Sequence, residues 1–315
     1  MRHGLFILFL LAFSAAAAEN GPANLQLRFP QNETLRYTWT MKSLSQTSGR
    51  EMGKPFTLTK NSEVAMLLLL KGLPLKGVNA GVSLRLQDYA YSEKDSIGPD
   101  VTAELTAGKG HIKYLENGKV VLDSENDIGS DKLPEFQQHI KDLESSEMRA
   151  VLDPAGRQIE MKSDNALTED SLKKMARGIF PILAGKEVKV GESWEDSFEM
   201  PELGDFKLAR PALVRSKMTF VKWVEKDHTP LAEIEVVSAW EKKVLKGEND
   251  KGLLVEFSEI NGHGIGTCHF DPAQGRFVDG DMATETKYRL DGELNGETTG
   301  LDVSSKTSFA FTLKK

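Results

Sequence analysis

The stretch Met148–Met161 constrains the fold most strongly, because it predicts two short strands joined by a tight turn. At the turn, in Asp153-Pro154-Ala155-Gly156, the Asp side chain can accept hydrogen bonds from backbone amides, and proline fixes φ at the next position. The glycine closes the turn. The flanking residues alternate between apolar and polar, as in a half-buried strand. A hairpin in an antiparallel sheet is therefore expected here.

An altered copy of this stretch occurs at Thr267–Val278, near the other end of the chain. There Asp271-Pro272-Ala273 is followed by Gln274-Gly275, which is one residue longer and fits a type I turn closed by a glycine bulge. The echo predicts a chain of two related halves. Chance is the alternative explanation, because turns of this kind are common.

The N-terminal residues 1–18 have the pattern of a secretory signal peptide. A short polar start precedes the apolar run Leu5–Phe13, and Ala15–Ala18 offers a small-residue cleavage site. A retained N-terminal anchor is the alternative. Because no cysteine follows the expected cut, attachment of a lipid at a new N-terminal cysteine is excluded. We expect a periplasmic or extracellular protein.

The composition excludes several classes of partner. The net charge is −7 and both signs are spread along the chain, without a basic cluster that carries interleaved aromatic residues, so nucleic acid is not an expected partner. With Cys268 as the one cysteine, no internal disulfide can form. After the signal, the most apolar run is Val64–Leu70, which has the length of a strand and is too short to cross a membrane.

Alternation with period two predicts most of the remaining elements as strands. The predicted strands are Leu35–Lys42, Val64–Leu70, Val82–Gln87, Ala232–Val236, Leu253–Phe257, Thr284–Arg289 and Phe309–Leu313. Asn117-Gly118 between short apolar runs predicts a further hairpin. The polar stretch Ser43–Pro55 is expected to be a loop or the frayed end of a hairpin, and Gly72–Gly81 contains breakers.

Two segments change to the helical period. From Ser130 onward, Leu133, Phe136, Ile140 and Leu143 recur at three- and four-residue steps, which makes an apolar stripe of a helix. A second helix is predicted from Thr168, a good N-cap, to its end before Pro181. The fold class expected is therefore α+β, with two related halves of antiparallel sheet and two helices near the middle of the chain.

The domain organisation follows from these elements. Residues 19–185 are expected to form an N-terminal antiparallel half that carries both helices, and residues 186–315 a C-terminal antiparallel half. Trp194 is expected to anchor the core beneath the linker between the halves. The other tryptophans, Trp39, Trp223 and Trp240, are expected to anchor the sheets.

The order of helix, LDPAGRQIEM hairpin, second helix and KEVKVGESWEDS resembles a family of secreted bacterial proteins of unknown function. In that family the pattern V-x-V-G-D-S-W follows a helix in the same way, and Glu192 stands here where Asp is usual. The resemblance covers Met148–Trp194 best. It implies a secreted protein with an all-strand or mixed fold, and it implies neither an activity nor a functional residue.

The densest polar cluster, Asn261–Asp271, contains His263, Cys268, His269 and Asp271. Zinc or copper could use such ligands. However, neighbouring residues of a strand point to opposite faces, so Cys268 and His269 cannot both bind one ion from a regular strand, and a nucleophilic Cys–His pair meets the same obstacle. We therefore expect no metal site, with a small buried thiol and surface histidines instead.

Other patterns that could carry chemistry are weak. Ser193 lacks the second glycine of a nucleophile elbow. The carboxylate pairs Glu233/Glu235 and Asp279/Asp281 would share strand faces, but chance explains such pairs in an acidic chain. Gly262, Gly264 and Gly266 lack the strand-to-helix context of a phosphate loop. No catalytic, cofactor-binding or metal-binding residue is predicted, and no cofactor.

The leading functional hypothesis is an exported, non-enzymatic protein that binds a lipid or another hydrophobic ligand in a cavity of the sheets. Its support is Val64–Leu70, which is apolar on both faces and could line such a cavity, although a strand covered on both sides explains this run equally well. The alternatives are a structural or protein-interaction module of the cell envelope without a ligand and, least favoured, a hydrolase.

Overall fold

The computed structural model describes residues 21–31, 33–51, 54–74, 78–97, 101–109, 111–129, 138, 141–142, 145–165, 180–204, 206–249, 252–294 and 297–314. Its strands are β1 (Ala23–Asn24), β2 (Thr34–Glu51), β3 (Lys54–Leu73), β4 (Ala80–Ile97), β5 (Val101–Gly108), β6 (His111–Glu116), β7 (Lys119–Asp123), β8 (Glu147–Leu152), β9 (Gln158–Ser163), β10 (Glu187–Val188), β11 (Ser193–Leu203), β12 (Phe206–Lys226), β13 (Thr229–Trp240), β14 (Leu245–Asn249), β15 (Leu254–Asp271), β16 (Arg276–Leu294) and β17 (Glu297–Lys314).

The predicted α+β class is wrong, because the described residues are almost entirely strands. The first segment predicted as a helix lies largely outside the described residues; within it Gln138, Lys141 and Asp142 are helical, as is Ser145 just beyond it. The second, residues 168–179, lies wholly outside them. No described helix has the length and apolar character needed to cross a membrane.

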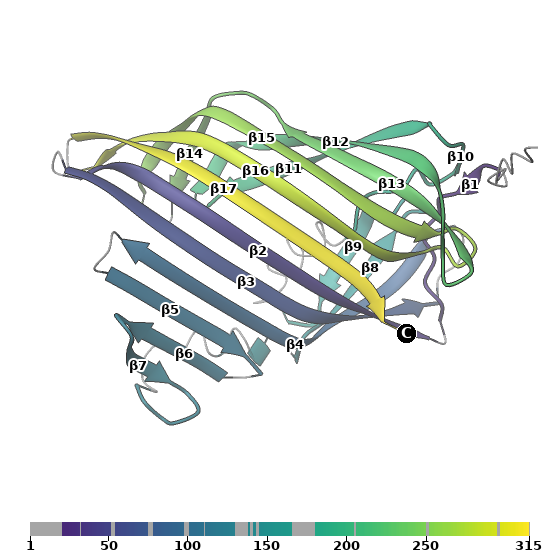
Figure 1. Ribbon diagram of the computed structural model, residues 1–315, viewed down its shortest axis with the longest axis horizontal. Helices are drawn as coiled ribbons and strands as arrows, with labels where there is room; N and C mark the ends of the chain where they lie inside the picture. The colour runs from purple at the N-terminus through teal and green to yellow at the C-terminus, as the bar shows by residue number, and fades with distance from the viewer. Residues whose placement is uncertain are drawn as a thin grey trace, which may run out of the picture.

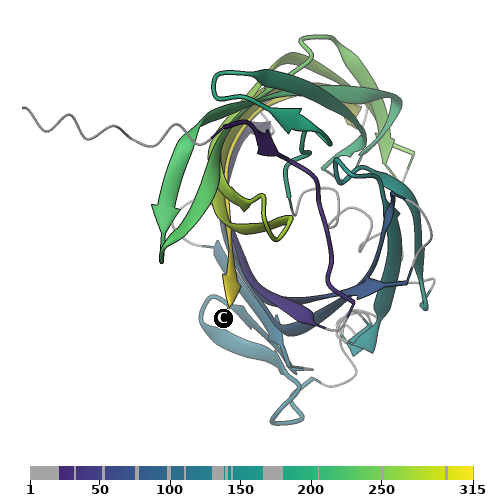
Figure 2. The same ribbon diagram turned by 90° about the vertical axis from the view of Figure 1, so that its right-hand side faces the viewer.

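Long antiparallel strands form one strongly curved sheet, in the order β11-β12-β13-β15-β16-β17-β2-β3-β4-β5-β6-β7 (Figure 1). Seen from the end, this sheet curls round an interior, so that it has a concave inner face and a convex outer face (Figure 2). Strands of the two predicted halves are joined within it, because β17 pairs with β2 from Leu301 to Lys314. The division into two related halves stays a prediction.

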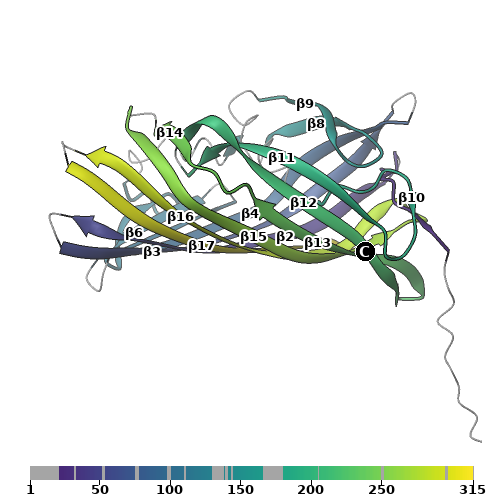
Figure 3. The same cartoon turned by 90° about the horizontal axis from the view of Figure 1, so that it is seen from above.

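The sheet forks at β4. Its first part, from Ala80 to Arg85, pairs with β8, whereas its last part, from Ala90 to Ile97, pairs with β5. Asp88 adopts a left-handed φ of 51° between the two parts, where the register of β3 and β4 shifts. As a result β8 and β9 continue the curl, and β5, β6 and β7 extend from it as a separate wing (Figures 1 and 3).

Residues 180–186, which we call the strap, help to close the gap between β9 and β11. The amide of Leu183 donates to the carbonyl of Ala155 at 2.8 Å, and the Nε1–H of Trp194 on β11 donates to the carbonyl of Ile182 at 2.9 Å. Arg157, just before β9, adds an ion pair to Asp196 of β11 at 2.9 Å. The predicted anchoring role of Trp194 fits this position, since its ring packs against the main core.

Residues 25–30 cross one end of the curled sheet (Figure 2) and contact both Asp-Pro turns. The amide of Leu27 donates to the carbonyl of Pro154 at 2.9 Å, and the next amide, of Arg28, donates to the carbonyl of Gly275 at 2.7 Å. The predicted turn glycines adopt left-handed conformations, with φ of 91° at Gly156 and 69° at Gly275. Both predicted hairpins are confirmed as β8–β9 and β15–β16.

An aromatic cluster fills the interior beside this end. Phe180 of the strap stacks on Phe277, with ring centroids 5.2 Å apart, and meets Tyr37 and Phe311 edge to face at 5.0 and 5.1 Å. Tyr37 donates its hydroxyl to the carbonyl of Phe277 at 2.7 Å. The strap is thus attached to the concave face through one phenylalanine.

The predicted strands are confirmed, and the turn at Asn117-Gly118 joins β6 and β7 as expected. Of the two alternatives for Ser43–Pro55, the loop is wrong and the end of a hairpin is confirmed, because β2 continues to Glu51 and pairs with β3, which starts at Lys54. This part of the hairpin has polar residues on both faces, so alternation could not reveal it.

Candidate functional site

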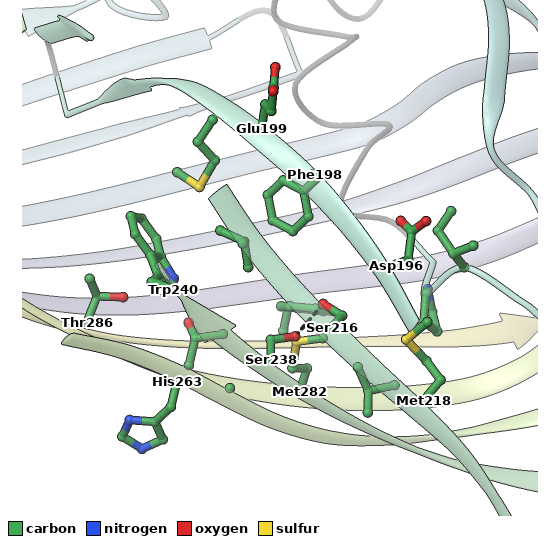
Figure 4. A pocket seen from close by; sticks show the side chains of 18 of the residues that line it. Asp196, Phe198, Glu199, Ser216, Met218, Ser238, Trp240, His263, Met282 and Thr286 are labelled. Carbon is green, nitrogen blue, oxygen red and sulfur yellow. Dashed lines mark hydrogen bonds between the residues drawn. The ribbon is translucent and has the colours of Figure 1, made fainter. Parts of the chain in front are cut away.

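The concave face encloses an apolar cavity, the first chamber, with a volume of about 570 Å³. Its walls carry Val214 and Met218 of β12, Val236 and Trp240 of β13, Met282 of β16 and Phe309 of β17. Phe198 of β11 and the strap residues Phe180 and Ile182 border the opposite side. In Figure 4 the ring of Phe198 points toward the side chains of β12 and β13.

One glycine of β15, Gly264, borders this chamber. Gly262, Gly264 and Gly266 alternate along the strand and all lie on its buried face. A Cβ at Gly264 would lie 2.9 Å from Cγ2 of Thr284, and one at Gly266 would lie 2.5 Å from the carbonyl oxygen of Asp281. The lack of a side chain at Gly264 and Gly266 therefore permits close packing of β16, and at Gly262 the indole ring of Trp240 lies where a side chain would be.

The hydroxyl groups inside the first chamber bind protein atoms. Ser216 and Ser238 hydrogen-bond each other at 2.8 Å, and Thr284 donates to the carbonyl of Thr307 at 3.4 Å. The serine pair uses one of its two O–H donors internally, so it adds few polar groups to walls that are mostly apolar. The chamber is thus suited to apolar groups, which need no hydrogen-bond partner.

Charged groups border the first chamber without converging on one point. The carboxylate of Glu199 and the ring of His263 point away from it (Figure 4). Asp196 is paired with Arg157. A nucleophile, base or metal site requires side chains that meet. Glu199, His263 and Asp196 therefore do not form such a group among the described residues.

A second apolar cavity, the second chamber, has a volume of about 400 Å³ on the other side of the strap. It is bordered by Leu70 of β3, Val82 and Leu84 of β4, and Ala150 of β8. Phe180, Pro181, Ile182, Asp196 and Phe198 border both chambers.

The residues of the predicted polar cluster do not come together. Cys268 is buried on the inner face, where burial raises the pKa of its thiol, whereas His263 and His269 lie on the outer face. The carboxylate of Asp271 accepts hydrogen bonds from the backbone amides of Ala273 and Gln274, each at 3.0 Å, within its own turn. Among the described residues, no three His, Cys, Asp or Glu side chains are close enough to hold a metal ion.

Instead, His269 joins acidic residues of the two neighbouring strands on the convex face. Its Nδ1 lies 2.5 Å from Oδ1 of Asp279, and its Nε2 lies 3.6 Å from Oε2 of Glu233. Lys226 also binds Asp279. Burial raises the pKa of Asp279, but the hydrogen bonds from Lys226 and His269 outweigh this effect and keep the pKa below its usual value. The cluster is an ion-pair network across β12, β13, β15 and β16.

The remaining candidates also have structural partners or lie apart. Ser193 shares a hydrogen bond of 2.9 Å with the hydroxyl of Thr219. The pairs Glu233/Glu235 and Asp279/Asp281 belong to the convex surface, away from both chambers.

The run at residues 64–70 was expected to line the cavity, but only its last residue, Leu70, borders a chamber. The other inward side chains, Val64, Met66 and Leu68, are buried in the core. The residues that make the first chamber were missed. The three glycines of β15 with period two were a weak signal, because Gly264 borders the chamber whereas Gly262 packs against Trp240.

No protein-family model matches the chain, and no curated protein matches it. Among solved structures, the translocator domain of autotransporter NalP from Neisseria meningitidis shares 6% identity, with 89% of this chain and 90% of that chain covered and a TM-score of 0.19. OccK5 (OpdH) of Pseudomonas aeruginosa shares 7% identity over 90% of this chain and 99% of that chain, with a TM-score of 0.21. Similarity this low supports neither a shared fold nor a shared function.

Proposed function

We propose that this protein is an exported, non-enzymatic carrier or receptor that binds a hydrophobic molecule against the concave face of its sheet. The observation that carries this proposal is the first chamber, with its apolar walls. Its volume of about 570 Å³ lies within the range of roughly 300–1,000 Å³ that small-molecule pockets occupy.

The chemistry of the walls supports binding over catalysis. Met218, Met282 and Phe309 present soft, apolar surface, and methionine adapts to ligands of irregular shape. Burial of an apolar chain against such surface contributes roughly 25 cal/mol per Å² removed from water. Because the wall hydroxyls bind each other or the backbone, they provide no nucleophile with an adjacent base.

Export is proposed from the sequence of residues 1–18, which precede the described residues. A lipid or similar molecule outside the cytoplasm must be shielded from water while it moves, and a curved sheet with an apolar inner face can shield it.

The test is a fluorescence titration of the purified mature chain with an acyl-chain probe. We expect saturable binding and competition by unlabelled fatty acyl compounds. Thr284 lies on the inner face of β16 opposite Gly264, so Thr284→Phe should occupy the first chamber and weaken binding at least about tenfold, or about 1.4 kcal/mol.

The matched control is Ala283→Phe, which places the same ring on the exposed outer face of the same strand. It should leave the affinity unchanged. Absence of saturable binding to the wild-type protein, or equal affinity in both variants, would refute the proposal and favour an interaction module without a ligand.

A further inference from the structure

We infer that the ligand is a lipid with two apolar chains, one in each chamber, which diverge from the gap between β9 and β11. This inference rests on the proposed function and specifies the class of ligand. It requires two separate cavities, a common point between them, and a place for polar groups at that point.

The two cavities satisfy the first requirement. Their volumes are about 570 and 400 Å³, and each is within the range of a ligand pocket. Apart from β11, which borders both, they lie against different strands, since the first is built on β12, β13, β15 and β16 and the second on β3, β4, β8 and β9. A ligand with a single apolar chain would leave one of these two apolar cavities unfilled.

The strap provides the common point. Phe180 and Ile182 border both chambers, as does Phe198 of β11. Phe180 is fixed by its stack on Phe277, with planes 6° apart, so it stands as a partition between the chambers. Phe198 is 43% exposed, which leaves apolar surface open at the place where two chains would separate.

Charged side chains gather at this place. Arg157 donates to Asp196 at 2.9 Å across the gap, and Asp153 lies 3.6 Å from the same guanidinium group. Arg157 borders the second chamber, and Asp196 borders both. The guanidinium group carries five N–H donors, so it can bind an oxygen of a head group in addition to these carboxylates. A polar head at the gap with apolar chains on either side matches this distribution.

The test compares a phospholipid with two acyl chains and the lysophospholipid with the same head group and one chain. Affinity and stoichiometry are measured by native mass spectrometry and by titration in detergent below its micellar concentration. Thr284→Phe occupies the first chamber, and Ala150→Phe occupies the second, because Ala150 is a buried wall residue there. Arg149→Phe on the exposed face of β8 is the control.

We expect one two-chain lipid per protein, bound at least about tenfold more weakly by either chamber variant, and unchanged in Arg149→Phe. The one-chain lipid should lose affinity in Thr284→Phe only. If Ala150→Phe binds the two-chain lipid as tightly as the wild type does, the inference is wrong while the proposed function stands. If the wild type binds neither lipid nor the acyl probe, the proposed function itself fails.

Thermal unfolding of each variant shows whether it is folded before binding is measured. If either phenylalanine variant unfolds, the smaller changes Thr284→Leu and Ala150→Leu replace it, with the same pattern expected at a smaller magnitude.

Discussion

Phe180 stacks on Phe277 with ring centroids 5.2 Å apart and planes 6° apart. The contact joins the strap to a strand of the concave face, although the two residues are far apart in sequence. Since Phe180 also borders both chambers, the same side chain helps to hold the strap and lies between the cavities.

Removal of this ring should therefore be costly. Phe180→Ala is expected to lower the free energy of unfolding by about 3 kcal/mol, through lost burial and lost aromatic contacts. Phe198→Ala is the control, because that ring is 43% exposed and should cost less than about 1 kcal/mol. Urea unfolding of both variants provides the measurement, and equal losses would show that Phe180 does not anchor the strap.

Tyr37 should contribute a hydrogen bond as well as packing. Its hydroxyl is buried and donates to the carbonyl of Phe277 at 2.7 Å, so Tyr37→Phe is expected to cost about 1–1.5 kcal/mol. Tyr114→Phe removes an exposed hydrogen bond to Glu116 and should cost less than about 0.5 kcal/mol. A Tyr37→Phe variant as stable as the wild type would contradict this account.

The glycines of β15 should differ in their tolerance of a methyl group. At Gly266 a Cβ would lie 2.5 Å from a backbone oxygen, so Gly266→Ala must move a strand and should cost about 2 kcal/mol. At Gly264 the nearest atom is the end of the Thr284 side chain at 2.9 Å, which can rotate. Gly264→Ala should therefore cost less. Thermal unfolding would reveal the order, and the reverse order would be inconsistent with the close approach of β15 and β16.

The network around His269 predicts a dependence of stability on pH. The folded-state pKa of Asp279 is lowered, so its contribution is present above the unfolded pKa of about 3.9 and is lost as pH falls through the lower folded value. The difference in unfolding free energy between the wild type and Asp279→Asn should be largest near neutral pH and should shrink below about pH 4.

The control for this prediction is Asp281→Asn, an exposed carboxylate on the same face of β16. Its effect should be small. Guanidinium unfolding at several pH values provides the comparison, and a pH-independent loss in Asp279→Asn would mean that the network does not set the pKa.

Local rules predicted many elements correctly. Asp153 and Asp271 mark the two turns, and the alternation at residues 35–42 marks the inner face of β2. Each of these signals depends only on neighbours in sequence and on one apolar face. These elements can therefore be predicted without knowledge of the tertiary structure.

The extent of the strands could not be predicted in the same way. Ser43, Ser45 and Thr47 continue the inner face of β2. They are polar because the apolar core does not extend along the whole concave face of the sheet. Their strand is maintained by pairing with β3 and β17 on both sides, which is long-range information. Apolar periodicity therefore predicted a β2 that was too short, and it could not decide between a loop and the end of a hairpin for the rest.

The site was missed for a related reason. The chambers depend on which strands curl toward each other. The strap that divides them is held by hydrogen bonds of its backbone to the carbonyl of Ala155 and to the indole N–H of Trp194. The run at residues 64–70 is the most apolar after the signal, and its side chains Val64, Met66 and Leu68 are packed in the core, whereas Leu70 borders the second chamber. An apolar strand thus predicts burial and does not reveal whether open space lies beside it.

The central claim is that the chambers of the concave face hold apolar chains. Native mass spectrometry of the protein purified from its own host, with lipid analysis of a solvent extract, tests it most directly. The account predicts a bound two-chain lipid in the wild-type protein and its loss in Thr284→Phe, with Ala283→Phe like the wild type. A wild-type protein that carries no apolar molecule and acquires none from added lipid would contradict it.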